Sequence, residues 1–459
     1  MISPPPSFYP IIFKEYSFLV RATFRKVGGN TMNRFKANQK LLFRVETVFN
    51  LRPLEKYEIL FSFLDTSPLE ILYPSTGRPP ISYEALLKAL VYKNIKNIAY
   101  LSDLVRELQD NPDLALVFGF HPLHLPCVEN FSAFLGDTEN KIFQEVRNSL
   151  VSKLIKLKEI KGTYLTFDSS NIPVKVKENN LKTSIKDRFD KAKKPKGDPG
   201  SRLSIMVHFP KPFQKEIKYF WGYRNFVLSD ALSELSLTEE TRAANVVDSK
   251  VIIPQLKLAK DRFDLNIRGV IADSGLDSAK VLSFIICDLK AKPYIARNLR
   301  REKDLKVSPT GNRICLAGFE MLYWGKFKEK GRTRVKFVCP IIHSKKFRKE
   351  HPFCPWMHPQ FVKGTGCFAY IQVLSEDIRK QIAYDTPKFK KIYNLRSGSE
   401  RIFSRLLDLC MQNPSVKGLR AVSNHCTIAH ITVLLVALTA TKTGNKDKIR
   451  FIKSFLPNI

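Results

Sequence analysis

Apolar residues recur at helical spacing in the first part of the chain, between residues 57 and 151. One group runs from Leu86 to Val91, and a second runs from Leu101 to Leu108. The Pro-Pro-x-Ser run at residues 79–82 is typical of a helix start, and Asn111-Pro112 is typical of a break. The spacing therefore predicts a bundle of four or five short helices joined by turns.

The pattern changes near residue 162, where apolar and polar residues begin to alternate as they do in β-strands. Three strands are followed by helix, strand, helix and strand, an order typical of a mixed sheet with covering helices. Helical spacing returns at the end of the chain, in residues 388–411 and 427–438. The predicted strands are residues 163–168 (continuing extended at 172–177), 203–208, 216–223, 265–272 and 293–297, and the helices between them are residues 245–258 and 277–289.

Residues 305–372 interrupt this order, so we interpret them as a β-rich insertion. Basic residues there occupy the even positions on both sides of a predicted turn at Lys330-Gly331. This alternation predicts a hairpin with one wholly cationic face. Like charges on one small face repel each other, which favours contact with DNA phosphates over a merely solvated strand. The cations are Lys326, Lys328, Lys330, Arg332, Arg334 and Lys336.

The net charge narrows the choice of partner. The chain has 459 residues, and 76 Lys and Arg against 43 Asp and Glu give a formal net charge of +33. Such a surface favours nucleic acid, then an acidic membrane surface, and fits a metabolic enzyme poorly. The longest apolar run, Ile428–Ala440, is too short to span a bilayer, and no signal peptide is visible. We therefore expect a cytoplasmic protein with no membrane partner.

Two aspartates follow apolar strands, Asp168 after Tyr-Leu-Thr-Phe and Asp273 after Gly-Val-Ile-Ala. Each alone could be an ordinary turn or N-cap residue. Together, at the strand ends of an α/β sheet, they mark the edge where ligands bind. A basic protein that places carboxylates beside phosphodiesters needs a cation to bridge the like charges, and Mg²⁺ both does this and activates water.

A third acid, Glu400, lies in the helical segment near the end of the chain. Its spacing to Phe403 and Leu407 predicts that it lies on the apolar stripe, where an ionised carboxylate is costly unless it is paired or holds a metal. Tyr393 and Arg396 precede it by seven and four residues, which puts all three on one side of a continuous helix. The alternative is a glutamate near a helix start that pairs with a neighbouring arginine.

These acids resemble a known family. Asp168 in Thr-Phe-Asp-Ser-Ser, Asp273 in Ile-Ala-Asp-Ser-Gly-Leu-Asp-Ser and Glu400 in Tyr-x-x-Arg-x-x-x-Glu resemble the DDE transposases of bacterial insertion sequences, in particular the group with a Tyr-Arg-Glu-Lys signature. Gly77–Pro80 with its following helix, and Tyr219–Asp248, are also similar to segments of those enzymes.

The likeness covers about residues 55–440, with one departure: the signature lysine falls at Leu407. The resemblance implies a ribonuclease H-like core in which the three acids hold two Mg²⁺ (or Mn²⁺) ions. It implies cleavage at transposon ends and strand transfer into target DNA, with Tyr393 and Arg396 contacting DNA near the scissile phosphate. A homodimer on double-stranded DNA, at the bacterial nucleoid, is the expected assembly.

Four cysteines gather in the insertion, at positions 315, 339, 354 and 367. Four thiols could hold a structural Zn²⁺, and the Cys-Pro pairs at residues 339 and 354 look like zinc knuckles. However, no Cys-x-x-Cys pair is present, and spacings of 24, 15 and 13 residues match no common zinc finger. The sequence therefore favours idle thiols, with a zinc site of Cys315, Cys339, Cys354 and Cys367 as the alternative.

The fold class expected is α+β: a ribonuclease H-like mixed sheet with flanking helices, an inserted β-rich segment and an amino-terminal helical domain. Two other functions stay open beside the transposase, namely a related metal-dependent DNA nuclease and a domesticated or decayed copy that only binds DNA. The predicted domains are a basic arm (1–45), a helical DNA-binding domain (46–155), the first part of the catalytic core (156–304), the insertion (305–372) and helices completing the core (373–459).

Overall fold

The computed structural model describes residues 54–452, apart from short gaps at 77–79, 122, 212–213, 299–307, 309–311, 330–331, 373–377 and 385. The chain divides into a unit of residues 1–55 and a unit of residues 56–459, and the elements below belong to the second unit except for the first residue of α3. The basic arm predicted for residues 1–45 lies outside the described residues.

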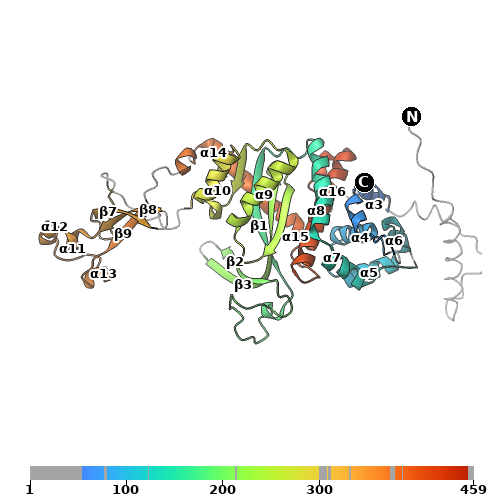
Figure 1. Cartoon of the computed structure of the whole chain (residues 1–459), viewed down its shortest axis with the longest axis horizontal. Helices are drawn as coiled ribbons and strands as arrows, with labels where there is room; N and C mark the ends of the chain where they lie inside the picture. The colour runs from blue at the N-terminus through green and yellow to red at the C-terminus, as the bar shows by residue number, and fades with distance from the viewer. Residues whose placement is uncertain are drawn as a thin grey trace, which may run out of the picture. The chain divides into compact units, whose positions relative to one another are not determined.

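The amino-terminal part of the described chain is helical, as predicted (Figure 1). Ser82 begins α4 by accepting a hydrogen bond from the Ala85 N–H, and Pro112 opens α6, which ends at Gly119 with a left-handed φ of +98°. The predicted helix start and break are therefore confirmed. The elements are α3 (Glu55–Ser62), η1 (Ser67–Leu72), α4 (Tyr83–Ile95), α5 (Leu101–Asp110), α6 (Pro112–Phe118), α7 (Val128–Asp137) and α8 (Asn140–Lys156).

A six-stranded sheet follows, in the order β2-β3-β1-β5-β6, with β4 also paired to β3. β1 is antiparallel to β3 and parallel to β5, which is parallel to β6. The order β4-β3-β1-β5-β6 is that of a ribonuclease H-like sheet, so the predicted fold class is confirmed. The strands are β1 (Tyr164–Pro173), β2 (Arg202–Lys211), β3 (Gln214–Asp230), β4 (Leu235–Ala243), β5 (Gly269–Ala272) and β6 (Lys292–Ile295).

Helices cover both faces of this sheet. Thr238 on β4 bonds to Gln255 of α9 (Asp248–Phe263), whereas its neighbour Glu239 accepts a hydrogen bond from Thr427 of α16 (Leu419–Lys442). Since successive strand residues point to opposite faces, α9 and α16 lie on opposite sides. The other helices after β5 are η3 (Ser274–Leu276), α10 (Ala279–Ser283), its continuation η4 (Phe284–Asp288), η5 (Ile378–Gln381), α14 (Pro387–Tyr393), η6 (Asn394–Arg396), α15 (Ser397–Asp408) and η7 (Lys446–Lys448).

Helix α16 is longer than the predicted segment and is the central helix of the core. It packs against α4, α7, α8 and β4. Among the described residues it is the one helix long and apolar enough to cross a membrane, with a mean hydropathy of 1.6, but that window is completely buried inside the protein. The helix therefore has the environment of a core helix in this structure.

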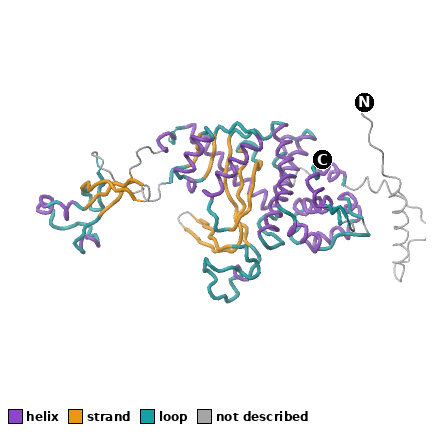
Figure 2. Tube along the Cα trace, viewed as in Figure 1, coloured by secondary structure: helices purple, strands orange, loops and turns teal. Residues whose placement is uncertain are grey.

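Residues 308–372 carry a second, three-stranded sheet, drawn in orange strands in Figure 2. Its order is β7-β8-β9, and three short helices lie between β8 and β9. The strands are β7 (Leu322–Glu329), β8 (Arg332–Val338) and β9 (Phe368–Gln372), and the helices are α11 (Pro340–His343), α12 (Lys345–Glu350) and α13 (Pro359–Val362).

The prediction of a single cationic face on this hairpin is wrong. Lys326 is paired with Val335, and Phe327 with Arg334, so Lys326 and Arg334 lie on opposite faces of the sheet. The reason is the length of the connection. With two residues between the strands, Glu329 at the end of β7 pairs with Arg332 at the start of β8, so the pairs next to the turn join an odd-numbered to an even-numbered residue. Lys328 lies on the face of Lys326, Lys336 lies on the other face over the Phe368 ring, and the side chain of Arg332 lies outside the described part.

Candidate active site where the pairing of β1 and β5 ends

Asp168 and Asp273 occupy adjacent positions of two neighbouring parallel strands. The last paired residues are Phe167 on β1 and Ala272 on β5, and each aspartate follows directly. Neighbouring strands lie about 4.8 Å apart, so the two carboxylates share one edge of the parallel part of the sheet. β1 itself does not end at Asp168, contrary to the prediction, because it continues to Pro173 along β3.

Both carboxylates are partly held by local backbone. Asp168 Oδ1 accepts a hydrogen bond from the Ser169 N–H at 2.8 Å, and Asp273 Oδ1 accepts one from the Ser274 N–H at 2.6 Å. Asp273 begins η3 in this way and is exposed. One oxygen of each carboxylate is thus fixed by a main-chain donor.

The surroundings of Asp168 disfavour its negative charge. Burial raises the pKa of Asp168, and the nearby carboxylate of Asp248 raises it further. The Ser169 N–H, the Ser399 hydroxyl and Arg396 oppose this shift. The Ser399 hydroxyl lies 3.1 Å from Asp168 Oδ2 and 2.7 Å from the Arg396 carbonyl oxygen, so its one proton serves one acceptor at a time.

Tyr393, Arg396 and Glu400 lie side by side where α14 passes through η6 into α15. Arg396 donates to Glu400 Oε1 at 2.8 Å. Burial raises the pKa of Tyr393; Arg396 opposes this shift and Asp273 adds to it, so the Tyr393 hydroxyl is near both charged groups. The structure therefore brings the Tyr-x-x-Arg-x-x-x-Glu segment to the edge that carries the two aspartates.

The predicted position of Glu400 on an apolar stripe is wrong. The buried stripe of α15 consists of Ser399, Ile402 and Leu406, one residue before the predicted set. The Glu400 side chain is 61% exposed and pairs with Arg396, which is the arrangement of the alternative interpretation. The predicted stripe and the observed stripe differ by one residue. On an α-helix a shift of one residue rotates the side chain by about 100° around the helix axis.

We call Asp168, Asp273 and Glu400 the carboxylate edge. The carboxylate oxygens are ligands that Mg²⁺ prefers, and the raised pKa of Asp168 indicates that its charge lacks sufficient compensation. These two features fit a divalent cation. In the part of the chain that the structure describes, however, no group of three or more His, Cys, Asp or Glu side chains is placed so that it could hold a metal ion. Glu400 would have to release Arg396 to join the two aspartates.

Two groups that the sequence did not reveal contact this site. Asp248, the first residue of α9, accepts a hydrogen bond from the Ser169 hydroxyl at 2.7 Å and pairs with Arg224 at 3.3 Å. Ser399 contacts Asp168 as described above. An aspartate at a helix start and a serine beside a glutamate are common patterns, so only the folded arrangement distinguishes them.

The structure also shows the surroundings of Leu407, which occupies the position of the signature lysine. Leu407 is 45% exposed, on the outer side of α15. Neither neighbouring arginine is free to replace a lysine there, because Arg401 and Arg405 both bind buried Glu234, at 2.7 and 3.4 Å. Arg450 completes this group on the same carboxylate at 3.1 Å.

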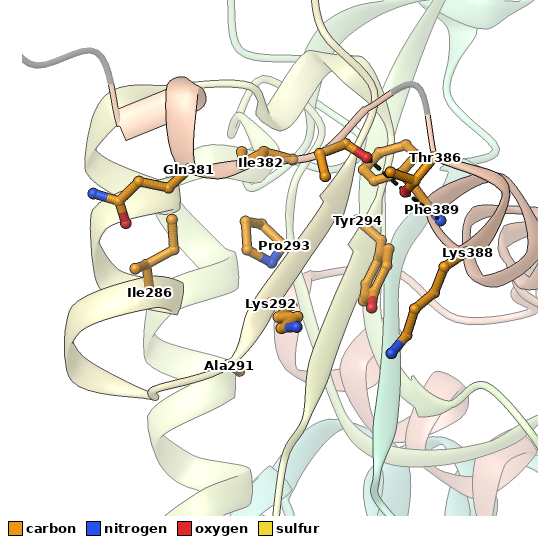
Figure 3. Close-up of a pocket in the computed structure, with 11 residues that line it drawn as sticks. Ile286, Ala291, Lys292, Pro293, Tyr294, Gln381, Ile382, Thr386, Lys388 and Phe389 are labelled. Carbon is orange, nitrogen blue, oxygen red and sulfur yellow. Dashed lines mark hydrogen bonds between the residues drawn. The ribbon is translucent and has the colours of Figure 1, made fainter.

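A cavity of about 280 Å³ lies next to the site, between β6 and α14 (Figure 3). The rings of Tyr294 and Phe389 line it 5.6 Å apart, and Lys388 extends along the same wall. Phe389 in turn stacks on Tyr393 with centroids 5.9 Å apart. None of the described residues that line the cavity is acidic, and its contact with the carboxylate edge runs through Phe389 and Tyr393.

The four cysteines of the insertion come from separate segments and pack together. Cys367 packs against Cys339 and Cys354 in one small core, and beside Cys315 in another. We call these four side chains the thiol cluster. All of them are free thiols.

Comparison with known proteins agrees with this architecture. Residues 165–435, which are 271 of the 459 residues, match the family described as Transposase DDE domain. Residues 34–135 match the family described as Transposase domain (DUF772). The fold is a ribonuclease H-like sheet with helices on both faces. The chain belongs to the DDE transposase family.

Two further comparisons complete this result. None of the curated proteins matches the chain. A solved structure, the "piggyBac transposase synaptic complex with hairpin DNA", aligns with a TM-score of 0.36 and 14% identity, over 88% of this chain and 78% of that one.

Proposed function

We propose that this chain cleaves DNA at the ends of an insertion sequence and joins the freed 3′-hydroxyl to target DNA, in a reaction that requires Mg²⁺. The observation that supports this proposal most is the arrangement of Asp168 and Asp273 on neighbouring parallel strands, beneath the segment that carries Tyr393, Arg396 and Glu400. Carboxylates placed by sheet register at one edge suit a shared divalent cation.

In this proposal Asp168, Asp273 and Glu400 hold the cations. When bound, the cations lower the pKa of the attacking water or hydroxyl and stabilise the leaving oxygen. Arg396 is released by Glu400 and binds a phosphate oxygen, and Tyr393 stacks or bonds beside it. Ser399 orients Asp168 by donating to its Oδ2. In the first step water replaces the 3′-oxygen on phosphorus, and in the second step that 3′-oxygen replaces one in the target strand.

The partners proposed are double-stranded transposon ends and target DNA, bound in the cytoplasm at the nucleoid by two copies of the chain. The net charge of +33 supports a polyanion as the partner. The resemblance of the acidic signature to insertion-sequence transposases supports the dimer and the location.

A labelled transposon end, incubated with and without Mg²⁺, tests the function. We expect cleavage with a free 3′-hydroxyl, and joined product after target DNA is added. Asp168→Asn and Asp273→Asn should abolish both products while DNA binding stays equal or tightens, because a repulsive charge is removed. Asp261→Asn, on the exposed side of α9, is the matched control.

Each alternative function has its own result in this assay. Cleavage without joined product would identify a nuclease. Binding without cleavage by the parent protein, with Mg²⁺ and with Mn²⁺, would identify a copy that only binds DNA. Cleavage by Asp168→Asn at the rate of the parent would exclude Asp168 from the site.

A further inference from the structure

The thiol cluster brings together side chains from four segments of residues 308–372. Cys315 precedes β7, Cys339 follows β8, Cys354 lies between α12 and α13, and Cys367 precedes β9. Cys339 and Cys354 are buried, and Cys315 and Cys367 are half-buried. The four cysteines are 13 to 24 residues apart in sequence, so the fold of the region and not their spacing brings them together.

Contacts within the cluster run through Cys367. Its thiol hydrogen-bonds with both Cys315 and Cys339. Cys339 and Cys354 are in turn members of one buried core with Ile341, against which Cys367 packs. Cys367 therefore connects Cys315 to the buried core that contains Cys339 and Cys354.

The backbone around two of the cysteines has the same tight turn. The Gly318 N–H donates to the Cys315 carbonyl oxygen at 3.0 Å, and the Met357 N–H donates to the Cys354 carbonyl oxygen at 3.0 Å. The third residue after each cysteine is left-handed, with φ of +83° at Gly318 and +47° at Met357. A left-handed Met costs about 1–2 kcal/mol, so other interactions hold the turn at Cys354 in place.

Gly366 allows the fourth cysteine to approach. Its φ is +69°, and a Cβ at this position would lie 2.7 Å from the Cys339 Cβ. Any side chain at residue 366 would therefore separate Cys367 from Cys339. The close approach of the two cysteine segments depends on this glycine.

The histidines of the same region are engaged elsewhere. His343 packs on Trp324 with ring centroids 4.8 Å apart, and His351 packs on Phe319 at the same distance. His358 Nδ1 accepts a hydrogen bond from the Gln360 N–H at 3.2 Å. The ligand set offered by this region is accordingly four sulfurs without a histidine.

The region has little else to stabilise it. In the described part of this region the two small cores consist of Met321, Val335 and Phe337, and of Cys339, Ile341 and Cys354, with Val338 also buried. Large apolar side chains beside Cys354 stay exposed, with Phe353 at 76% and Trp356 at 59%. Small domains with so little buried apolar surface usually need a metal or a cross-link to fold.

We propose that Cys315, Cys339, Cys354 and Cys367 bind one Zn²⁺ and that this ion holds residues 308–372 in their fold. Four thiols release four protons to solvent, and four Zn–S bonds of about 2.3 Å form in a tetrahedron. Since no three of the described His, Cys, Asp or Glu side chains are placed to hold a metal ion together, the four sulfurs have to turn toward a common point as they lose their protons. Zn²⁺ suits this set because it favours tetrahedral thiolate and undergoes no redox change.

Metal analysis of the full-length chain tests the site without any assumption about activity. After purification and reconstitution with Zn²⁺, we expect about one zinc per chain by mass spectrometry of the elements. Replacement of Zn²⁺ by Co²⁺ should give the visible absorption of a tetrahedral thiolate complex. Less than about a fifth of a zinc per chain, no thiolate absorption with Co²⁺, or iron in place of zinc would each overturn the proposal.

Variants separate the thiol cluster from the other cysteines. Cys339→Ser and Cys354→Ser should reduce the zinc content to near zero, whereas Cys127→Ser and Cys287→Ser, which are exposed and outside this region, should retain it. A full zinc complement in Cys339→Ser would contradict the assigned ligands. Where the serine variants do not yield folded protein, the Co²⁺ spectrum of the parent decides alone.

Discussion

The carboxylate edge and the thiol cluster place their side chains by different means. Asp168 and Asp273 are positioned by strand pairing inside a large sheet, which is covered by helices on both faces. The four cysteines are positioned by turns around two small cores. We therefore expect the large sheet to be stable without a cation at the first site, whereas the proposed zinc is part of what stabilises residues 308–372.

The donor atoms of the two sites, carboxylate oxygens and cysteine sulfurs, also differ in the metals that they favour. Carboxylate oxygens are hard ligands, and weakly held Mg²⁺ leaves positions for substrate oxygens. Thiolates are soft ligands, and four of them close the coordination of Zn²⁺ so that no substrate position remains. Under the two proposals above, one chain uses one metal for reaction and another for its fold, and the donor atoms decide which metal each site takes.

Glu400→Gln gives the largest expected effect among the tests of this comparison. If Glu400 joins the aspartates in binding the cation, the cleavage rate of the variant should fall at least about 100-fold. A loss of that size exceeds the effect of replacing a residue that only hydrogen-bonds to a metal ligand. If Glu400 only pairs with Arg396, as it does in the structure, the rate should change a few-fold. Cleavage kinetics on a labelled end, with Glu240→Gln as control, distinguish the two.

Chelation should affect the two regions unequally. A strong chelator should raise the rate of limited proteolysis within residues 308–372 about tenfold or more, because that region loses its proposed zinc. Residues 80–298, whose core is formed by the sheet and α16, should stay resistant. Mass spectrometry of the fragments over time measures this, and equal loss of both regions would contradict the division.

The two faces of the β7–β8 hairpin give the third test. Lys326 and Lys328 lie on one face, and Arg334 and Lys336 on the other. If one face meets DNA phosphates, replacing its two cations by alanine should reduce the slope of log affinity against log salt by about 1.8, and the other pair should leave it unchanged. Fluorescence anisotropy at several salt concentrations measures the slope. If neither pair of substitutions changes this slope, the hairpin is not part of the DNA interface.

Acid should destabilise the core through two buried histidines of α16. Burial lowers the pKa of His425 to about 4 and that of His430 to about 3, from a usual value of 6.5. Below pH 6.5 the unfolded chain binds protons that the folded chain does not, so stability falls as pH falls, by at most about 1.4 kcal/mol per pH unit and histidine.

Urea unfolding followed by circular dichroism between pH 6.5 and 4 measures this slope. His425→Asn and His430→Asn should each flatten it, whatever their effect on stability at neutral pH. A slope that neither substitution alters would assign the acid sensitivity to other groups.

Much of the fold could be predicted because burial and turns leave direct traces in the sequence. The strand that ends at Ala272 is fully buried and reads as a continuous apolar run, and Asp273 follows it as predicted. The predicted strand segments also lie in or overlap the strands of the sheet, apart from residues 172–177, which mostly follow β1. Local sequence patterns were sufficient to predict the elements whose conformation depends mainly on their own residues.

The errors arose where position depends on pairing or on distant contacts. The cationic face failed because strand register, not alternation within each strand, decides which of Lys326 and Arg334 share a face. Glu400 was assigned to the wrong face because the buried stripe starts at Ser399, whose hydroxyl reaches Asp168 in a segment 231 residues away. The spacing of the four cysteines did not indicate that they meet in the fold, because the spacing rules for zinc sites describe pairs of nearby cysteines.

Helix α16 also has a consequence for the order in which the protein is made. Its buried residues contact elements that are synthesised hundreds of residues earlier, such as Asn94 on α4, which bonds to Thr432, and Ser236 on β4, which bonds to His430. These contacts cannot form until α16 itself has been synthesised. We therefore expect a chain that stops before α16 to lack the core that holds the sheet and the amino-terminal helices together.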